Sequence, residues 1–340
     1  MQVVLCFLLN RSEIPRHMDK QSKQNLLRKI RKFAKPNAFR SYMQLGTTTF
    51  VLLLCVAMTL LHSNALLWVL TWLISLVMLM RLVIVQHDCG HNSFLSSRTQ
   101  NKIIGYALGI PTTIPFGYWC LSHNTHHRNQ SNLDARSETE YPTLTVAEFK
   151  GLSPREKRRY KLTRSAFGVC FLIPLVLLLG VYRFPNAAAR NAKLTLSMLS
   201  LDLILLAIWA GSFYFVGPMF FGWVFSLHVV LMSIAFIFFY FQHQYEDAYW
   251  ASKKDFDFVT AGLQGSSFLQ TSRFVHWCTG NIGYHHIHHL CWSIPNYALP
   301  AAHLACLAAG HQPKKITLWE VPSTFGYALW DSQQQKMVKF

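Results

Sequence analysis

Clustered histidines are the feature of this 340-residue sequence that could do chemistry. His87 and His91 are four residues apart, so on a continuous helix both imidazoles lie on one face. Two further segments, 123–127 and 285–289, hold histidines at positions i, i+3 and i+4, which again groups three imidazoles on one helical face. His243 lies between two glutamines. Because neutral imidazole binds zinc, copper, iron and nickel, this pattern predicts metal binding.

The remaining histidines are interpreted as ordinary interfacial or buried side chains, because a lone histidine most often has that role. His286 lies inside the third cluster, but His285, His288 and His289 complete the i, i+3, i+4 set without it. An exchange of roles between His286 and its neighbour stays open. The isolated histidines are His17, His62, His228, His276, His303 and His311.

About nine imidazoles are more than one ion can use, since a single ion takes roughly four to six ligands. The sequence therefore predicts two metal ions. A closed zinc site needs only about four ligands. A redox metal is favoured if the clusters lie beside lipid, as the apolar segments described below indicate. No protein side chain can cleave the unactivated C–H bonds of a lipid, whereas iron with dioxygen can.

The elements that must position these histidines are apolar. Hydrophobic residues make up 51% of the chain and charged residues only 14%, against about 25% charged in a typical soluble domain. The mean hydropathy is +0.21. This composition excludes a disordered chain, a collagen and a small disulfide scaffold. The eight cysteines are scattered without a CxxC pair, which indicates reduced thiols.

Four segments are predicted to cross the membrane as two antiparallel hairpins: residues 43–61 with 65–85, and residues 195–216 with 219–241. Each is long enough to cover a bilayer core of about 30 Å as a helix. Arg81, near the end of the second span, is expected to extend its guanidinium to the interface.

Two other apolar segments, 103–121 and 165–182, are interrupted by prolines or glycines. A crossing at 103–121 would place the basic 128–164 loop opposite the basic N-terminus, against the positive-inside rule. A crossing at 165–182 would separate the histidines that follow the two hairpins. We therefore predict an all-α integral membrane protein with four transmembrane helices in two hairpins, a cytoplasmic histidine-rich cap, and one or two re-entrant or interfacial helices.

The formal net charge of +17 fits this arrangement, because basic residues flank membrane segments and contact anionic head groups. Nucleic acid is therefore not expected as a partner. We divide the chain into a basic cytoplasmic segment (1–41), a membrane domain (42–311) and a cytoplasmic C-terminal tail (312–340). Residues 1–17 are expected to be dispensable, since a polar basic run follows Met18. The membrane would be the bacterial inner membrane or the endoplasmic reticulum.

The three boxes at 87–91, 123–127 and 285–289, each after an apolar segment, resemble those of the membrane fatty acid desaturases, which carry an all-histidine di-iron centre. The resemblance covers about residues 43–296, including the Gln-His-Gln at 242–244. The box His-Asp-Cys-Gly-His followed by Asn-Ser-Phe, together with His285, resembles the acyl-lipid, omega-6/delta-12-like branch. Front-end desaturases carry Gln in place of His285 and often a fused haem domain, and this sequence has neither.

The resemblance implies that two iron ions, with dioxygen as co-substrate, insert a cis double bond into the acyl chain of a membrane lipid. It makes residues 42–311 the desaturase domain. It also implies an external electron donor, a ferredoxin or a small b-type cytochrome with its reductase, because the chain has no dinucleotide or haem motif. The implied iron ligands are His87, His91, His123, His126, His127, His243, His285, His288 and His289.

Polar side chains in or near the boxes are candidates for orienting the imidazoles by accepting their outer N–H groups. For each of them an ordinary solvated or helix-capping role is the alternative. Trp119 either lines an acyl channel or anchors the interface. The polar candidates are Asp88, Asp134, Glu138, Glu246, Asp247 and Asn281.

Two other functions are compatible with these residues. Lipid or carotenoid hydroxylases and ketolases use related histidine boxes, and only their products distinguish them. A non-enzymatic membrane metal transporter or sensor would hold its ligands at mid-membrane, whereas these clusters lie at span ends. The oligomeric state is open. The basic stretch 150–164 either docks an acidic electron donor or contacts head groups.

Overall fold

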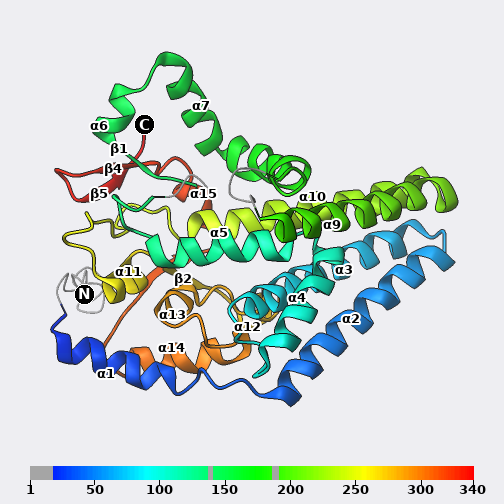
Figure 1. Cartoon of the computed structure of the whole chain (residues 1–340), viewed down its shortest axis with the longest axis horizontal. Helices are drawn as coiled ribbons and strands as arrows, with labels where there is room; N and C mark the ends of the chain where they lie inside the picture. Colours follow the sequence, from blue (N-terminus) through cyan, green and yellow to red (C-terminus); the bar gives the residue numbers. More distant parts are fainter. Residues whose placement is uncertain (1–17, 137–140, 186–190) are drawn as a thin grey trace, which may run out of the picture.

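The computed structural model describes residues 18–136, 141–185 and 191–340, and Figure 1 shows long helices joined to a cap of shorter elements. Four helices are long and apolar enough to cross a membrane: α2 (Ala38–Leu61), α3 (Ala65–Gly90), α9 (Ala192–Gly211, extended by η5, Ser212–Val216) and α10 (Pro218–Phe241). They form two hairpins whose turns lie together at the right of the view. The predicted spans and their pairing are confirmed.

Local sequence signals set the hairpin turns. The Asn64 side chain accepts a hydrogen bond from the Leu67 backbone N–H at 3.0 Å and so caps the start of α3. In the second hairpin, Gly217 adopts φ 119°, a region that favours glycine, and Pro218 occupies the first turn of α10. The Gly-Pro pair therefore ends one span and begins the next.

Arg81 lies inside the protein rather than at the interface, and is only 7% exposed. Its Nε donates to Thr48 Oγ1 at 3.4 Å and its Nη1 donates to the backbone oxygen of Trp277 in α12 (Arg273–Cys278). The guanidinium carbon stacks 4.2 Å from the Trp277 ring. The predicted extension to the interface is wrong. The backbone carbonyl and the indole of Trp277, about 200 residues further along the chain, contact the guanidinium beside α3 instead.

The segment predicted to re-enter folds as α4 (Arg98–Thr112) and α5 (Phe116–Asn129), and neither is among the four spans. At the break between them Thr112 Oγ1 donates to Gln86 Oε1 at 2.7 Å. The Gln86 amide donates in turn to the backbone oxygens of Gly105 and Ile114, at 3.2 and 3.1 Å. Non-helical backbone at membrane depth requires such internal partners, so Gln86 of α3 stabilises the turn.

The 165–182 segment continues α7 (Pro154–Arg164) as three short helical pieces, and the two parts meet at a bend of 73°. A broken span and a re-entrant segment both fit this bend, so its interfacial placement stays a prediction. Beyond it, Arg183 Nη1 pairs with Asp202 of α9 at 2.7 Å, while Nη2 donates to the Thr113 backbone oxygen. Arg183 thus ties the segment to both α9 and the α4–α5 turn. The pieces are η2 (Gly168–Leu172), α8 (Ile173–Val176) and η3 (Leu177–Val181).

The cap is built from short helices and two small sheets. Strand β4 pairs in parallel with β1 and antiparallel with β5, and β2 pairs in parallel with β3. Its helices are α1 (Lys20–Arg31), α6 (Val146–Gly151), α11 (Phe258–Gln264), α12, α13 (His285–Leu290), η6 (Asn296–Ala298), α14 (Leu299–Leu307) and α15 (Val321–Thr324). Its strands are β1 (Leu144–Thr145), β2 (Ser267–Gln270), β3 (Lys314–Thr317), β4 (Leu329–Asp331) and β5 (Lys336–Val338).

Residues 312–340, which the sequence set apart as a tail, pack into this cap. They supply β3, β4 and β5. Strand β4 pairs with β1, which precedes α10 in the sequence, and β3 pairs with β2, which follows α10. Met337 is fully buried, in a core that also holds Phe241 and Trp330. The C-terminal segment therefore forms one body with the rest of the cap.

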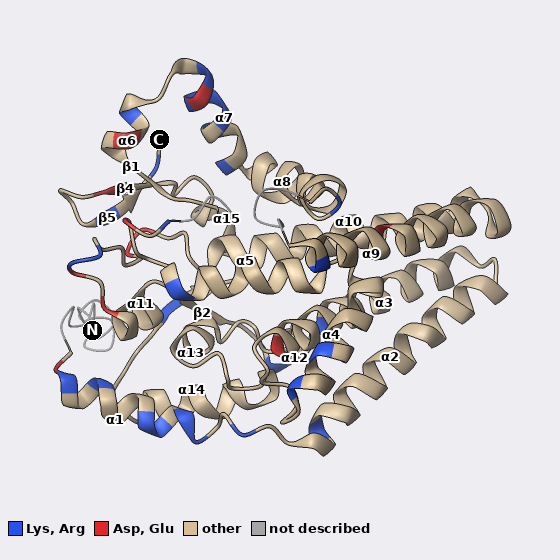
Figure 2. Cartoon of the chain, viewed as in Figure 1, with Lys and Arg blue, Asp and Glu red and all other residues tan. Residues whose placement is uncertain are grey.

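Charges are distributed as the two-hairpin arrangement predicts. Figure 2 shows most Lys and Arg residues on the cap and on the ends of the hairpins next to it, whereas the distal hairpin turns are uncharged. Helix α1 carries basic residues on its exposed side and buries Leu26 and Ile30 against α13 and α14. Residues 1–17 lie outside the described residues, so their predicted dispensability stays a prediction.

Candidate metal centre

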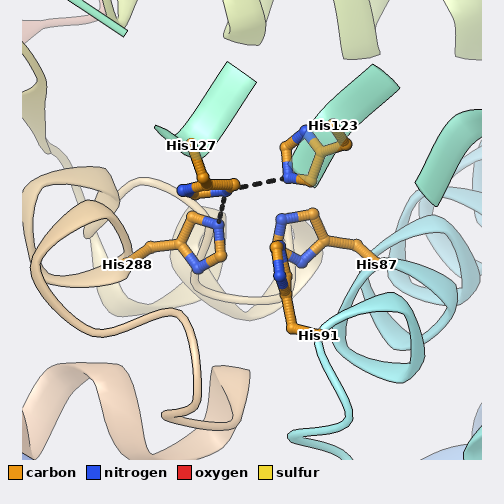
Figure 3. Close-up of side chains that lie close together, drawn as sticks. All are labelled: His87, His91, His123, His127 and His288. Atoms are coloured by element: carbon orange, nitrogen blue, oxygen red, sulfur yellow. Dashed lines mark hydrogen bonds between the residues drawn. The ribbon is translucent and has the colours of Figure 1, made fainter. Parts of the chain in front are cut away.

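The structure gathers all nine histidines singled out from the sequence into two groups. Within each group the candidate ligand nitrogens lie within 4.8 Å of one another. The first group, drawn in Figure 3, points its imidazoles into one space from α3, α5 and α13. It consists of His87, His91, His123, His127 and His288. The second consists of His126, His243, His285 and His289.

Each three-histidine box serves both groups rather than one. In α5, His123 and His127 are four residues apart and enter the first group, whereas His126 enters the second. In α13, His288 enters the first group, and His285 and His289, again four residues apart, enter the second. Adjacent helical residues point about 100° apart, so one turn of helix between two sites can supply both. The spacing alone did not indicate that each box divides between two groups.

In the first group the Nε2 atom of His127 lies 3.0 Å from that of His123 and 2.9 Å from that of His288. A neutral imidazole carries one N–H, so His127 Nε2 cannot donate to both neighbours. His87 Nε2 and both ring nitrogens of His91 are buried without a hydrogen-bond partner among the described residues. Adjacent ligands of one ion held at about 2.1 Å lie about 3 Å apart, so a shared cation accounts for this spacing.

The second group has the same short separations. The Nε2 atom of His243 lies 3.2 Å from that of His126 and 3.0 Å from that of His285, and the His285 and His289 Nε2 atoms are 3.1 Å apart. All four histidines are buried. Four converging imidazole nitrogens with no carboxylate among them form a donor set that suits a transition metal rather than calcium or magnesium.

Polar groups outside the two clusters contact the Nδ1 atoms of two histidines. His87 Nδ1 lies 3.2 Å from Asp88 Oδ1, and His243 Nδ1 lies 2.9 Å from the Gly265 backbone oxygen. A carboxylate only accepts, so the Nδ1 atom of His87 carries the proton and its Nε2 lone pair faces the first group. His243 Nδ1 also lies 3.0 Å from Gln130 Nε2, which donates to the same Gly265 oxygen at 2.6 Å, so this contact positions the ring. Gly265 has no signal in the sequence that would have indicated this role.

Burial keeps the imidazoles neutral, as metal binding requires. It lowers the pKa of His126, His127 and His289 well below the ordinary value, and neighbouring imidazoles lower it further. Burial also lowers the pKa of His243, to about 4, although the hydrogen bond to Gly265 acts in the opposite direction. At neutral pH these side chains are therefore ready to bind a cation.

Asp88 is the predicted orienting residue that the structure places beside a group. Its Oδ1 faces His87, and its Oδ2 accepts from the backbone N–H and side-chain amide of Asn296, at 2.7 and 2.8 Å. Asn296 Oδ1 accepts in turn from Gln44 Nε2 at 3.0 Å. Asp88 is 3% exposed, so these donors compensate a buried carboxylate. Asn296 belongs to no motif, and the sequence did not single it out.

Three other acidic candidates contact other residues on the surface. Asp134 accepts from the Lys253 backbone N–H at 2.7 Å, Asp247 pairs with Lys314 at 2.6 Å, and Glu246 lies 3.4 Å from Lys336. Within the described residues none of the three contacts a histidine of either group, which does not support the predicted role.

Asn281 and Glu138 complete the set of polar candidates. Asn281 adopts φ 60° in the turn before α13, and its backbone N–H donates to the His276 oxygen at 2.7 Å. Asn281 therefore stabilises the turn before α13. Glu138 lies outside the described residues, so its role stays a prediction.

Trp119 forms a wall of the first group. Its ring stacks on His123 with centroids 4.3 Å apart and planes 20° apart, and lies 5.5 Å from the His87 ring. A Cβ on Gly90 would lie 2.8 Å from the indole, so glycine at this position lets Trp119 approach. This placement favours a role at the site over one as an interface anchor.

His286 faces away from both groups, as the sequence analysis preferred. Its Nε2 lies 3.0 Å from His303 Nδ1, in an aromatic cluster that includes Phe268. Of the isolated histidines, His276 stacks on Tyr284 with ring centroids 4.3 Å apart in the same region. These side chains pack on the side of α13 that carries His286. The opposite side of the helix faces the two histidine groups.

The fatty acid desaturase family model matches residues 63–319. A fatty acid desaturase of Bacillus subtilis is 33% identical over 338 residues, covering 95% of this chain and 91% of that protein. The chain belongs to the fatty acid desaturase family. It is therefore an oxidoreductase of lipid metabolism, as the histidine boxes predicted.

More distant desaturases carry further information in their names. An sn-1 acyl-lipid omega-3 desaturase (ferredoxin) of Nostoc is 25% identical over 272 residues, which is 78% of this chain and 74% of that protein. A chloroplastic sn-2 acyl-lipid omega-3 desaturase (ferredoxin) of Helianthus annuus is 27% identical over 258 residues, 70% of this chain and 55% of that protein. The family assignment does not separate the omega-6 branch from the omega-3 branch.

Proposed function

We propose that this desaturase inserts a cis double bond into the acyl chain of a membrane lipid, using dioxygen and two iron ions. The observation that carries the proposal is the convergence of nine histidines into two adjacent groups of five and four. Two bound iron ions would supply, with dioxygen, the oxidising power that unactivated C–H bonds demand. Overall, one –CH₂–CH₂– unit, one O₂, two electrons and two protons yield one cis –CH=CH– unit and two waters.

The protein's own residues hold, orient and enclose this chemistry. The five histidines of the first group would hold one iron and the four of the second group the other. Asp88 keeps the proton on the outer nitrogen of His87, and Gly265 with Gln130 orients the ring of His243. Trp119 covers the first group, which limits access of bulk water to the reacting atoms.

The position of the groups along the spans supports a substrate that comes from the bilayer. His87 lies in the last turn of α3, and His243 follows the end of α10 by two residues. An acyl chain extending from the membrane would therefore meet the groups where the spans join the cap. A shift of about 1 Å in such positioning changes which carbon reacts, so the walls of the site would set the double-bond position.

We further propose that the donor is a ferredoxin, because relatives that carry "ferredoxin" in their names align with 78% and 70% of this chain. The cap would face the cytoplasm, since the basic residues lie on it and beside it (Figure 2). A small b-type cytochrome is the other donor to test. The membrane would be the bacterial inner membrane or the endoplasmic reticulum.

The test is a fatty-acid profile by mass spectrometry of methyl esters, from a host that lacks polyunsaturated lipids and is supplied with a ferredoxin system. We expect a new unsaturated acyl chain that disappears in the His288→Ala variant. Fragmentation of the dimethyloxazoline derivative of the new acyl chain would locate the bond and so separate the omega-6 from the omega-3 branch. A hydroxylated or ketone product with no new alkene, from a membrane-inserted and iron-loaded protein, would contradict the proposal.

A further inference from the structure

Trp292 links one histidine group to the protein surface. It lies two residues beyond the end of α13 and is partly exposed. Its ring centroid is 5.5 Å from that of His127 and 5.9 Å from that of Phe258, the first residue of α11. Both distances are within the range of packed aromatic pairs.

Among the described residues, His127 makes the shortest ring contact between the two groups. It belongs to the first group, with its ring 4.5 Å from that of His288, yet its ring is also 4.4 Å from that of His289 in the second group. A side chain packed on His127 is therefore one residue away from the first candidate metal position, and two residues, His127 and His289, away from the second.

Desaturation needs electrons from another protein, and the sequence contains no dinucleotide or haem motif that could store them. Electron tunnelling falls steeply with the width of the gap, and a gap filled by packed side chains carries electrons better than one filled by water. The donor must therefore dock where few side chains separate the surface from a metal ligand. Trp292 and His127 offer a route of two side chains.

The charges around Trp292 favour an acidic partner. Arg128 follows His127 in α5, and Arg31 ends α1, whose Leu26 and Ile30 lie in the core against which Cys291, the neighbour of Trp292, packs. Both arginines are exposed and have no carboxylate partner among the described residues. The carboxylate next to Phe258, that of Asp257, is already paired with Lys23 at 2.9 Å.

The basic helix α7 is the other candidate surface. Figure 1 shows α7 at the top of the molecule and α13, α14 and α1 at the bottom, with α5 between them. In α7, the Lys161 ammonium lies over the rings of Phe149 in α6 and of Phe340, at 6.0 and 5.4 Å from their centres. The two surfaces are therefore separate and can be altered independently.

We propose that the surface formed by Trp292, Phe258, Arg31 and Arg128, the Trp292 face, docks a reduced acidic ferredoxin and passes its electrons through Trp292 and His127. This inference rests on the proposed function. Each double bond consumes one electron from each of two ferredoxins, which leave oxidised, together with two protons and one dioxygen that ends as two waters. Trp292 is neither oxidised nor reduced, and serves as the packed medium between donor and ligand.

The first experiment uses the iron-loaded full chain in nanodiscs under anaerobic conditions. Reduced ferredoxin is mixed with it and the oxidation of the ferredoxin is followed optically, with dithionite as a small reductant in parallel. We expect Trp292→Leu to lose most of the ferredoxin-dependent rate while iron content and reduction by dithionite stay unchanged. Trp319→Leu is the matched control, because Trp319 is 92% exposed and lies in the turn after β3.

The second experiment measures the Kd of ferredoxin for the same particles at low salt. The double reversal Arg31→Glu with Arg128→Glu should weaken binding about tenfold or more and flatten its salt dependence. The matched reversal on α7, Arg158→Glu with Arg159→Glu, should leave the Kd unchanged. A loss confined to the α7 pair, or an unchanged ferredoxin rate in Trp292→Leu, would overturn the inference.

These outcomes are separate from the failure of the proposed function. If the wild-type chain makes no alkene with any donor, the function itself is wrong. If it makes the alkene and the Trp292 variants accept ferredoxin electrons normally, only the docking surface is wrong. A Trp292→Leu protein that loses iron is replaced by Trp292→Phe, which keeps an aromatic ring against His127 and should retain most of the rate.

Discussion

His286 and His288 are two residues apart in one helix and face opposite sides of it. His288 points into the first group, 2.9 Å from His127, whereas His286 pairs with His303. We therefore expect His288→Ala to lose about half of the bound iron, because one of two ions loses a ligand from its set. His286→Ala should retain both ions and lose only stability. Elemental analysis of purified protein measures this, and equal iron loss in the two variants would contradict the assignment.

Asp88 connects a ligand to the cap through one buried carboxylate. Replacing it with Asn keeps the shape and an acceptor for Asn296, but weakens the acceptor for the outer N–H of His87. Loss of such an orienting partner typically costs about 10- to 100-fold in metal affinity or activity, so we expect a loss of that size in iron affinity, measured by competition with a chelator.

Asp247→Asn is the matched control for Asp88→Asn, because Asp247 contacts Lys314 on the surface. It should bind iron as the wild type does. An equal effect at both positions would indicate a general response to lost negative charge rather than the orientation of His87.

At the scale of helices, hydropathy predicted the four spans because a bilayer imposes its own length and composition on a helix. The same reasoning was wrong for Arg81, since its partner carbonyl at Trp277 comes from a distant cap helix that no local pattern indicates. It also could not divide His126 from His127 between two groups. That division depends on how α13 and the turn after α10 approach α5, which is decided by tertiary packing.

Helix α1 is predicted to stabilise the cap through its apolar side rather than its charges. Ile30 is fully buried against the core that also holds Ile287 of α13. Ile30→Ala should therefore destabilise the cap by about 2–5 kcal/mol, seen as faster proteolysis of the cap while the membrane hairpins stay protected. Lys23→Ala removes only a partly exposed ion pair with Asp257, worth about 0–1 kcal/mol. A larger effect from Lys23→Ala than from Ile30→Ala would contradict this.

At the scale of the whole molecule, the histidine groups join segments that are far apart in the chain. The first group connects the end of α3 with α5 and α13, and the second connects α5 and α13 with the turn after α10. Bound metal would therefore cross-link both hairpins to the cap. Without it, several buried ring nitrogens, such as both nitrogens of His91, have no partner among the described residues.

Metal removal should consequently weaken the assembly as a whole. A ligand at 100 times its Kd stabilises the state that binds it by about 2.7 kcal/mol. We expect dialysis against a chelator to lower the Tm of the purified protein in detergent, and added ferrous iron to restore it. His288→Ala should show a smaller shift than the wild type, because only its second group remains complete, whereas His286→Ala should respond fully. An unchanged Tm in the wild type after complete iron removal would mean that packing alone, through cores such as the one around Ile287, holds the cap on the hairpins.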